Sequence, residues 1–242
     1  TPRHVAYCRA LRPTDAELRR LAAARLAALE TENQASTPPR FYDPQHKEQH
    51  AFLGDTSRLK LEFCTRRAGK SFAYGLQLFE DAWKEPDVKC LYIAKTRKSA
   101  KGIIWTDVLK PINRALNLGA EPNYTDLTWT LPNGSCLFVV GADDEEEMSK
   151  LLGQKYKTAA IDEAEAWRTD IRGLIYDVLL PAMADRGGSI LLSGTPSNLK
   201  AGLFFEMTQD QDASTPGRWD YVDMDYGEKW SCHRWSALEN PH

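Results

Sequence analysis

A short basic stretch carries a glycine, a lysine and a serine at the spacing of a phosphate-binding loop. It runs from Cys64 to Ser71 as Cys-Thr-Arg-Arg-Ala-Gly-Lys-Ser and fits the G-x-x-x-x-G-K-[ST] pattern except at its first position, where cysteine replaces glycine. In such a loop Gly69 lets the backbone approach phosphates, and Lys70 reaches the β- and γ-phosphates. Ser71, at the start of the following helix, can bind magnesium. The stretch therefore predicts a nucleotide site.

A phosphate loop needs an acidic partner at the end of another buried strand, and Asp162 and Glu163 follow the apolar run 159–161. Asp162 would hold the water shell of the magnesium ion, and Glu163 would polarise the water that attacks the γ-phosphate. The plainer interpretation is an acidic helix start, because carboxylates favour that end of the helix dipole. With Lys70 upstream we favour catalysis, and we interpret Glu165 and the rest of that helix as structural.

A third strand runs into the small-residue turn Ser193-Gly194-Thr195-Pro196. The hydroxyls of Ser193 and Thr195 would be placed to sense the γ-phosphate. A Gly-Thr-Pro turn by itself is ordinary loop chemistry. Because the turn follows the strand with the acidic pair, we expect it at the same edge of the sheet.

The elements that must position these residues alternate between apolar strands and helical segments from residue 59 onward. This alternation is typical of an α/β fold, a parallel sheet with helices on its faces. The turn Pro132-Asn133-Gly134 predicts a hairpin between two flatter strands. The predicted strands are 59–63, 88–94, 127–131, 135–140, 158–161 and 189–192, and the predicted helices are 72–83 and 99–116.

The first forty residues differ from the rest of the chain. Residues Thr14 to Glu17 form a capping box that opens an Ala/Leu/Arg-rich helix reaching about residue 30. The polar, proline-containing run 33–39 is typical of a linker. We therefore assign 1–40 to a helical arm outside the main core, with packing as its default role and partner binding as the alternative.

The bulk composition is that of an ordinary globular protein. At 242 residues, 42% hydrophobic and 27% charged, the chain is long enough for one large α/β domain with appendages. No stretch approaches the roughly 18 consecutive apolar residues of a membrane span, and no signal-like block opens the chain, so we expect a cytoplasmic protein without membrane contact. The net charge of −3 argues against indiscriminate nucleic-acid binding. Any DNA contact must be local.

Several motifs in combination resemble one protein family. They are the double-arginine loop Arg66-Arg67-Ala68-Gly69-Lys70-Ser71, the sequence Ile161-Asp162-Glu163-Ala164, the Ser-Gly-Thr-Pro turn and the hairpin around Pro132-Asn133-Gly134-Ser135. From about Phe41 onward the chain resembles the ATPase domain of the large terminase subunit of tailed bacteriophages. The resemblance implies a P-loop NTPase of the ASCE, RecA-like kind, with a mainly parallel sheet flanked by helices in 41–203 and a small C-terminal lid subdomain in 204–242.

The resemblance also implies roles for individual residues. ATP and Mg²⁺ would be the cofactors, with Ser71 and Asp162 on the metal, and the segment after Pro44 is similar to the family's adenine-recognition segment, in which Gln49, or its rival Gln45, would contact the base. Arg66 or Arg67 would sense the γ-phosphate or reorganise the loop. Cofactor contacts are expected from Gln49, Arg66, Arg67, Ala68, Gly69, Lys70, Ser71, Ser193 and Thr195, and catalysis from Glu163, Lys70 and Arg67.

The implied function is a ring motor that hydrolyses ATP and pushes double-stranded DNA through a portal into an empty capsid. The turn at 193–195 would couple hydrolysis to movement. The expected partners are double-stranded DNA, the portal protein, the small terminase subunit and further copies of the chain in a ring, expected to be a pentamer, with a monomer in isolation as the alternative. The expected place is the host cell cytoplasm, docked transiently on the procapsid. Since the chain has no room for the family's nuclease half, we expect no DNA cleavage.

Ring motors of this kind use an arginine finger from the neighbouring subunit. In many terminases it precedes a glycine shortly before the acidic strand, and here Leu152 occupies that place. The finger therefore stays unassigned. Lys150, Lys155 and Arg168 are candidates on position alone.

The densest basic stretch, from Lys95 to Lys101, follows the second core strand. Its hydroxyl and cationic groups suit contacts to DNA phosphates at a helix N-terminus. A solvated face is the plainer interpretation, since most charge runs are solvated. The family resemblance favours DNA contacts from Arg97, Lys98 and Lys101.

Two other functions remain as alternatives. A superfamily 1 or 2 nucleic-acid translocase shares the loop and the acidic strand but needs a second core domain, for which the residues after Ser197 leave little room. A nucleotide-gated scaffold would keep Lys70 and Ser71 but would have little need for Glu163 beside Asp162. The intact carboxylates therefore favour an enzyme.

Overall fold

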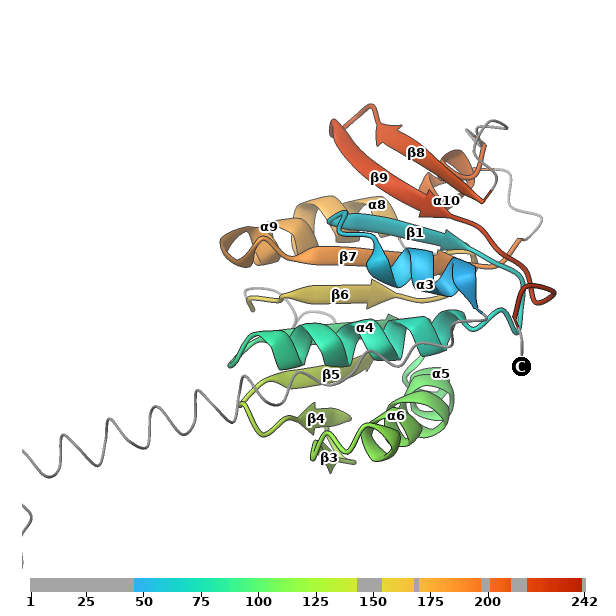
Figure 1. The fold of residues 1–242 in the computed structure, drawn as a ribbon. Helices are drawn as coiled ribbons and strands as arrows, with labels where there is room; N and C mark the ends of the chain where they lie inside the picture. The colour runs from blue at the N-terminus through green and yellow to red at the C-terminus, as the bar shows by residue number, and fades with distance from the viewer. Residues whose placement is uncertain (1–45, 143–153, 168–169, 197–200, 210–216, 241–242) are drawn as a thin grey trace, which may run out of the picture. The chain divides into compact units, whose positions relative to one another are not determined.

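A sheet of nine strands is the frame of the part of the chain that the computed structural model describes, residues 46–142, 154–167, 170–196, 201–209 and 217–240 (Figure 1). All of these residues belong to one unit, Pro39–His242. The strands are β1 (Leu59–Phe63), β2 (Lys89–Ala94), β3 (Glu121–Asn123), β4 (Thr128–Thr130), β5 (Cys136–Gly141), β6 (Thr158–Ile161), β7 (Ser189–Gly194), β8 (Arg218–Asp223) and β9 (Glu228–His233).

The strand order across the sheet is β3-β4-β5-β2-β6-β7-β1-β9-β8. Neighbours from β5 to β9 in this order are parallel, whereas β3-β4-β5 at one margin and β9-β8 at the other are antiparallel. One strand, β7, lies between β1, which leads into the phosphate loop, and β6, which ends at the acidic pair. With helices on both faces of this mainly parallel sheet, the predicted α/β P-loop NTPase fold is confirmed.

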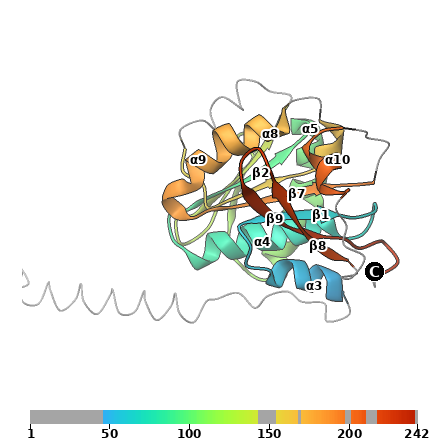
Figure 2. The same cartoon turned by 90° about the horizontal axis from the view of Figure 1, so that it is seen from above.

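Helices cover both faces of the sheet. They are α3 (Lys47–Gly54), α4 (Lys70–Lys84), α5 (Arg97–Ala100), η1 (Lys101–Leu109), α6 (Lys110–Ala115), η2 (Ala164–Ala166), α8 (Ile171–Gly173), η3 (Leu174–Leu179), α9 (Leu180–Met183), η4 (Ala184–Arg186) and α10 (Leu203–Met207). Helices α3 and α4 lie on one face, and α8, η3 and α9 lie on the other (Figures 1 and 2). Since alternate strand residues point to opposite faces, Tyr92 joins the core under α4, while Leu91 and Ile93 join the core under η3.

Two helices contain wide, π-helical turns, and each such turn ends shortly before a proline. Segments α5, η1 and α6 form one continuous helix in which η1 precedes Pro111, and η3 precedes Pro181 in the same way. Proline has no backbone N–H and its ring crowds the preceding turn, which a locally widened helix accommodates. The helices therefore continue past their prolines and still cover the sheet.

The predicted elements are present with small shifts of their ends. Helix α4 begins at Lys70, inside the phosphate loop, and the second predicted helix begins at Arg97. The hairpin around residues 132–134 joins β4 to β5 in antiparallel pairing. The short strand β3, the helices between residues 171 and 186, and the hairpin β8–β9 were not predicted.

The C-terminal segment differs from the expected separate lid. Strand β9 pairs in parallel with β1, with Leu61 opposite Cys232, and β8 pairs with β9, so the hairpin extends the main sheet. The physical reason is burial: Trp219, Tyr221 and Trp230 cover the same apolar core that β1 and β7 face. Within the described residues, the boundary drawn at 203 does not separate a subdomain from the sheet.

Several sequence predictions concern residues outside the described ranges. These are the helical arm in 1–40 and the residues Gln45, Lys150, Leu152 and Arg168. Among the helices that the structure does describe, none combines the length and the apolar character that crossing a membrane requires.

Candidate nucleotide-binding site

Three segments that are far apart in the sequence meet at one edge of the sheet. Strands β1, β7 and β6 are parallel neighbours, so their carboxyl ends lie at the same edge. The phosphate loop follows β1, Asp162 and Glu163 follow β6, and the residues from Ser193 to Thr195 close β7. The residues predicted to bind the phosphates, the metal and the attacking water are therefore brought together.

Lys70 connects two of these segments directly. Its Nζ lies 3.0 Å from the carbonyl oxygen of Thr65, 3.3 Å from that of Cys64 and 3.3 Å from Oγ1 of Thr195. All three acceptors are neutral. An anionic phosphate is a stronger hydrogen-bond acceptor for an ammonium group, so a bound nucleotide can compete for this side chain.

The cysteine at the first loop position has a structural explanation. Cys64 is not among the residues with positive φ, and its side chain is fully buried in the core under α4. Positive φ falls instead on Arg67, at 63°, and on Gly69, at 85°. A glycine is therefore required at position 69, where a side chain would also meet Gln49, but not at position 64.

Helix α3 reaches the loop with two side chains. Gln49 is only 7% exposed, and its Nε2 donates to the carbonyl oxygen of Gly69 at 3.0 Å. His46 lies with Nε2 3.1 Å from the carbonyl oxygen of Ala68. The structure thus places Gln49 against the phosphate loop, while its contact with the adenine base stays a prediction.

The remaining predicted loop residues lie where a nucleotide could meet them. The side chains of Arg66 and Arg67 are exposed, whereas Ala68 is buried and Ser71 is half-buried in the first turn of α4. A helix N-terminus of this length presents backbone N–H groups and a favourable dipole to an anion. This end of α4 therefore suits phosphate.

Asp162 is a nearly buried carboxylate, 4% exposed, held by neutral donors. Its Oδ2 accepts from the hydroxyl of Tyr92, and its Oδ1 accepts from the hydroxyl of Ser193 and from the backbone N–H of Glu163. No cationic side chain pairs with it among the described residues. Mg²⁺ prefers oxygen ligands and usually takes only one or two carboxylates besides water and phosphate, so Asp162 with Ser71 fits this ion.

Glu163 adopts a backbone conformation that is uncommon for a residue with a side chain. Its φ of 53° and ψ of 43° are left-handed, and the short helix η2 begins at the next residue. The indole Nε1 of Trp167 donates to the carbonyl oxygen of Asp162 at 3.0 Å and closes this turn. Such strain is typical of functional sites, where the surroundings hold a side chain in one direction.

Glu165 belongs to the site, although the sequence favoured a structural interpretation. Burial raises the pKa of its carboxyl group above the ordinary value, while a hydrogen bond from the backbone N–H of Thr195 and the charge of Lys70 act in the opposite direction. A side-chain carbon added at Gly194 would lie 2.7 Å from its Oε2. Glu165 therefore packs directly against the turn that follows the third core strand.

A second carboxyl group lies beneath the loop, inside the core. Glu62 on β1 is fully buried, and neither of its carboxyl oxygens has a hydrogen-bond partner among the described residues. Burial raises the pKa of Glu62 well above its ordinary value, despite the nearby charge of Lys70. The hydroxyl of Tyr74 on α4 is buried in the same region, near Ser193. These groups form a polar spot under the phosphate loop.

The basic stretch after β2 begins at the same edge of the sheet as the loop, because β2 is parallel to β6. Helix α5 is capped by Thr96, whose hydroxyl accepts from the backbone N–H of Ser99 at 3.0 Å. Lys98 and Lys101 are exposed, and Arg97 donates to the carbonyl oxygen of Thr125 at 2.6 Å. The stretch is accessible, and its contact with DNA stays a prediction.

One candidate for the arginine finger can be located. Lys155 precedes β6, so it lies at the edge of the sheet opposite to the phosphate loop. It pairs there with Asp185 at an exposed position. Within one copy of the chain Lys155 is therefore remote from its own site, and any role as a finger would require a neighbouring copy.

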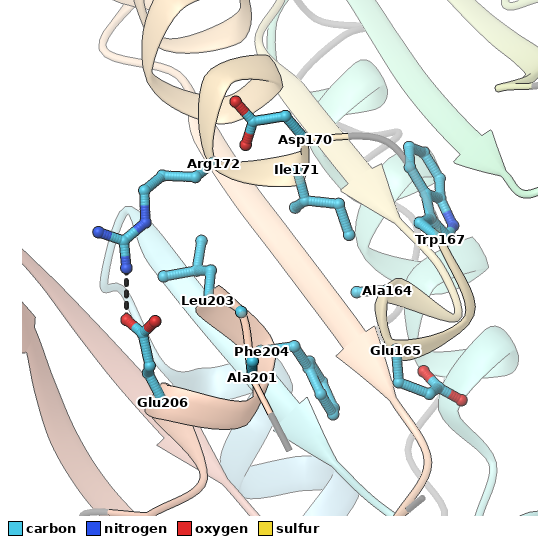
Figure 3. A pocket seen from close by; sticks show the side chains of 11 residues that line it. Ala164, Glu165, Trp167, Asp170, Ile171, Arg172, Ala201, Leu203, Phe204 and Glu206 are labelled. Carbon is cyan, nitrogen blue, oxygen red and sulfur yellow. Dashed lines mark hydrogen bonds and ion pairs between the residues drawn. The ribbon is translucent and has the colours of Figure 1, made fainter. Parts of the chain in front are cut away.

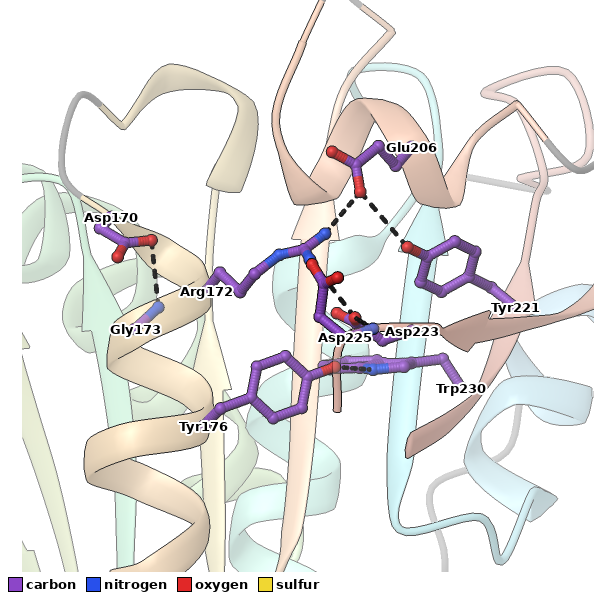
Figure 4. Close-up of polar contacts among 9 residues, drawn as sticks. All are labelled: Asp170, Arg172, Gly173, Tyr176, Glu206, Tyr221, Asp223, Asp225 and Trp230. Carbon is purple, nitrogen blue, oxygen red and sulfur yellow. Dashed lines mark hydrogen bonds and ion pairs between the residues drawn. The ribbon is translucent and has the colours of Figure 1, made fainter. Parts of the chain in front are cut away.

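A second polar cluster joins the C-terminal hairpin to the helices (Figure 4). Arg172 on α8 forms ion pairs with Glu206, Asp223 and Asp225. Trp230 donates from its indole to the hydroxyl of Tyr176 at 3.0 Å. A cavity of about 290 Å³ lies between this cluster and the site, with Glu165 at one end and Arg172 with Glu206 at the other (Figure 3).

The strand order, the loop after β1 and the acidic pair after β6 define the fold of an ASCE-type P-loop NTPase. We compared the chain with protein-family models, curated proteins and solved structures. No protein-family model matches the sequence, and no curated protein matches it. Solved structures do match, and several of them are large terminases of bacteriophages.

The ATPase domain of the large terminase of Thermus phage P74-26 is 18% identical, with a TM-score of 0.60, and the match covers 81% of this chain and 82% of that one. A large terminase of a thermophilic bacteriophage in complex with ADP is 13% identical, with a TM-score of 0.54, and the match covers 82% of this chain and 46% of that one. The HK97 bacteriophage large terminase is 16% identical, with a TM-score of 0.50 and coverage of 64% and 33%. This chain thus has the fold of a large terminase ATPase domain.

Proposed function

We propose that this chain hydrolyses ATP as the motor domain of a viral DNA-packaging terminase. The observation that carries the proposal is the meeting of Lys70, the pair Asp162–Glu163 and Thr195 at one edge of the sheet. Lys70 would bring positive charge to the transferred phosphate, and Asp162 would bind the metal ion. Glu163 would act as the base, and Thr195 would sense the γ-phosphate. The fold likeness to terminase ATPase domains supports the same reaction.

In the proposed reaction Lys70 moves from its loop carbonyls to the β- and γ-phosphates, and Arg66 or Arg67 approaches the γ-phosphate from the exposed side of the loop. Glu163 accepts a proton from the attacking water as the water oxygen bonds to the γ-phosphorus. The bond to the bridging oxygen breaks, and ADP leaves with its electron pair. Mg²⁺, held by Ser71 and Asp162, would neutralise charge on the phosphates.

The turn at 193–195 is proposed to couple hydrolysis to movement. Ser193 donates to Asp162, while Thr195 accepts from Lys70 and lies against Glu165. A nucleotide that draws Lys70 away changes the contacts of this turn. That change is the proposed start of the stroke on double-stranded DNA.

The assembly is proposed by analogy with the terminases whose fold the chain shares. Copies of the chain would form a ring, expected to be a pentamer, on the portal of a procapsid in the host cytoplasm, together with the small terminase subunit. Double-stranded DNA would contact the exposed stretch that contains Arg97, Lys98 and Lys101. No nuclease activity is proposed for this chain.

The test of the ATPase is steady-state hydrolysis by the wild type and by Glu163→Ala over a range of protein concentrations, with and without double-stranded DNA. We expect Glu163→Ala to lower turnover by roughly 10²–10⁴-fold while MgADP binding persists. Turnover per chain that rises with protein concentration would support catalysis completed by a neighbour. Equal hydrolysis by both proteins would refute the catalytic assignment, and binding without hydrolysis at any concentration would favour a nucleotide-gated scaffold.

DNA binding is tested separately with the triple variant Arg97→Ala, Lys98→Ala, Lys101→Ala. Each lost phosphate contact should lower the slope of log K against log salt by about 0.9. The DNA-free ATPase rate should stay the same, because these residues lie outside the phosphate loop. An unchanged salt slope would remove this stretch from the DNA interface.

A further inference from the structure

The carbonyl oxygens of the phosphate loop are held from outside by a segment that follows β9. We call residues 234–240 the strap. The indole Nε1 of Trp235 donates to the carbonyl oxygen of Ala68 at 2.6 Å, and Nδ2 of Asn240 donates to that of Arg67 at 2.7 Å. After β9 the strap passes the end of β1 beside the start of α4 (Figure 1).

The strap is attached to the loop by backbone contacts as well. The backbone N–H of Ala237 donates to Oγ1 of Thr65 at 2.7 Å, and the N–H of Thr65 donates to the carbonyl oxygen of Trp235 at 3.4 Å. Trp235 is 3% exposed, and its ring packs against Phe52 of α3 at a centroid distance of 5.9 Å. The strap is thus anchored in the core and presents two donors to the loop.

Helix α3 holds the next part of the same loop. Gln49 donates to the carbonyl oxygen of Gly69, and Nε2 of His46 lies beside that of Ala68. Three consecutive carbonyl groups, those of Arg67, Ala68 and Gly69, therefore accept from side chains outside the phosphate-binding motif, and that of Gly69 also accepts from the backbone N–H of Ala73 in α4 at 3.1 Å.

Hydrogen bonds to these carbonyl groups affect phosphate binding through the geometry of the peptide bond. In a trans peptide the C=O of one residue and the N–H of the next point to opposite sides. Fixing the carbonyls of residues 67–69 outward therefore turns the N–H groups of residues 68–70 toward the other side, where a phosphate anion would lie. Arg67 has a φ of 63°, a left-handed backbone conformation that is uncommon for a residue with a side chain. A hydrogen bond to its carbonyl group from outside the loop helps to hold this conformation.

We propose that Trp235 and Asn240 are positioning residues that keep the phosphate loop in its anion-binding shape before the nucleotide arrives. This inference rests on the proposed nucleotide function, because it assigns the loop to a phosphate ligand. Neither residue touches the nucleotide. Because the strap already orders the loop, less conformational entropy is lost when the nucleotide binds, which is the general effect of preorganisation.

The test uses Trp235→Phe and Asn240→Leu in the full chain, each of which removes the donor and keeps a side chain of similar shape. Trp219→Phe is the matched control, because Trp219 is also buried, at 5% exposure, and its indole donates to a backbone carbonyl, that of Met207, at 2.8 Å. That bond joins β8 to α10 and not to the phosphate loop. Calorimetry gives the Kd of MgADP, steady-state hydrolysis gives KM and kcat, and thermal unfolding gives Tm.

We expect Trp235→Phe and Asn240→Leu each to raise the Kd of MgADP and the KM of ATP by roughly two- to tenfold, which is the range for loss of one hydrogen bond, with kcat within about twofold. Trp219→Phe should lower Tm to a similar extent and leave the Kd unchanged. Amide hydrogen exchange in the absence of nucleotide should be faster at residues 66–70 in the two strap variants and unchanged in the control.

Two results would overturn the inference while leaving the proposed function intact. One is wild-type Kd and wild-type loop exchange in both strap variants. The other is an equal loss of affinity in Trp219→Phe, which would trace the effect to general destabilisation. A wild-type chain that binds no MgADP would instead refute the proposed function, and the inference with it.

Discussion

Two groups of acidic residues in this molecule are partnered in opposite ways. At the nucleotide edge Asp162 accepts from the hydroxyls of Tyr92 and Ser193, and no cation pairs with it among the described residues. At the C-terminal hairpin three carboxylates, those of Glu206, Asp223 and Asp225, surround one guanidinium group. Asp162 is oriented by neutral donors, whereas the three carboxylates at the hairpin share one cationic partner.

This difference distinguishes a carboxylate that is able to bind a ligand from a cluster of ion pairs with a structural role. Hydroxyl and amide donors fix the direction of a carboxylate without cancelling its charge, so it can still bind a metal ion or take a proton. A guanidinium group engages carboxylates through its fixed set of donors, which leaves little capacity for a ligand. The contrast supports the proposed reaction chemistry at the nucleotide edge, and the cluster around Arg172 attaches the hairpin to the helices.

The largest effect that sharpens this comparison is the loss of stability in Arg172→Met. Among the described residues, Arg172 is the ion-pair partner of the fully buried Asp223, so we expect Arg172→Met to lower the free energy of unfolding by about 3 kcal/mol and the Tm by roughly 6–12 °C. Hydrolysis per folded chain, measured well below the Tm, should change little. The control is Lys155→Met, whose ion pair with Asp185 is exposed and should not contribute measurably.

A Tm change of less than about 2 °C in Arg172→Met would contradict the structural assignment. So would a large fall in kcat at full folding. Either result would mean that the two acidic groups are less different than their partners suggest.

The nucleotide edge was largely predictable because its signals are local. The strand, loop and helix around Lys70, and the strand that ends at Asp162, each lie within a short run of sequence and keep their spacing in the fold. Strand alternation then implied a parallel sheet, and parallel strands bring their carboxyl ends together. The family resemblance predicted that Gln49 contacts the adenine base, which stays a prediction, and the structure places Gln49 against the carbonyl oxygen of Gly69.

The residues that were missed depend on contacts between distant parts of the chain. Trp235 and Asn240 reach the loop only because β9 adds to the sheet beside β1, and β9 has a pattern of Trp, Ser, Cys and His that carries no helix or strand period. Glu165 was interpreted as a structural residue of a helix that follows the acidic pair. The left-handed turn at Glu163 and the short η2 place it against Thr195 instead, and a positive φ at glutamate has no sequence signal.

A smaller effect is expected when the carboxyl group of Glu165 is altered. Glu165→Gln keeps an acceptor for the N–H of Thr195, so we expect kcat within about threefold of the wild type, while Glu165→Ala removes the acceptor and should lower kcat about tenfold. KM should stay unchanged in both. Steady-state hydrolysis beside Glu163→Gln, which should be inactive, distinguishes the two glutamates.

If Glu165→Ala hydrolyses ATP like the wild type, Glu165 is structural, as the sequence alone suggested. If Glu165→Gln is as slow as Glu165→Ala, the charge of Glu165 matters more than its hydrogen bond. The second outcome would mean that the carboxylate of Glu165 takes part in hydrolysis together with those of Asp162 and Glu163.

The smallest effect concerns Glu62, which belongs to neither group, because it lies at the nucleotide edge and no described residue donates a hydrogen bond to its carboxyl group. Burial raises its pKa well above the ordinary value, so the folded chain keeps this proton to a higher pH than the unfolded chain, which releases it near pH 4.3. The folded state then binds more protons over that interval, and stability falls as the pH rises. The contribution is fully present below about pH 4 and is lost as the pH passes through the raised pKa.

Glu62→Gln does not titrate, so its stability relative to the wild type should increase from pH 4 to pH 8 by at least about 1 kcal/mol. Urea unfolding of both proteins across this range measures the difference in their stability. Asp55 and His233 also have shifted pKa values, but they contribute equally in both proteins and therefore cancel. Glu121→Gln, at an exposed position on the marginal strand β3, is the control without such a trend. A flat difference for Glu62→Gln would mean that Glu62 has a partner that holds its charge, and that it belongs with the oriented carboxylates of the nucleotide edge.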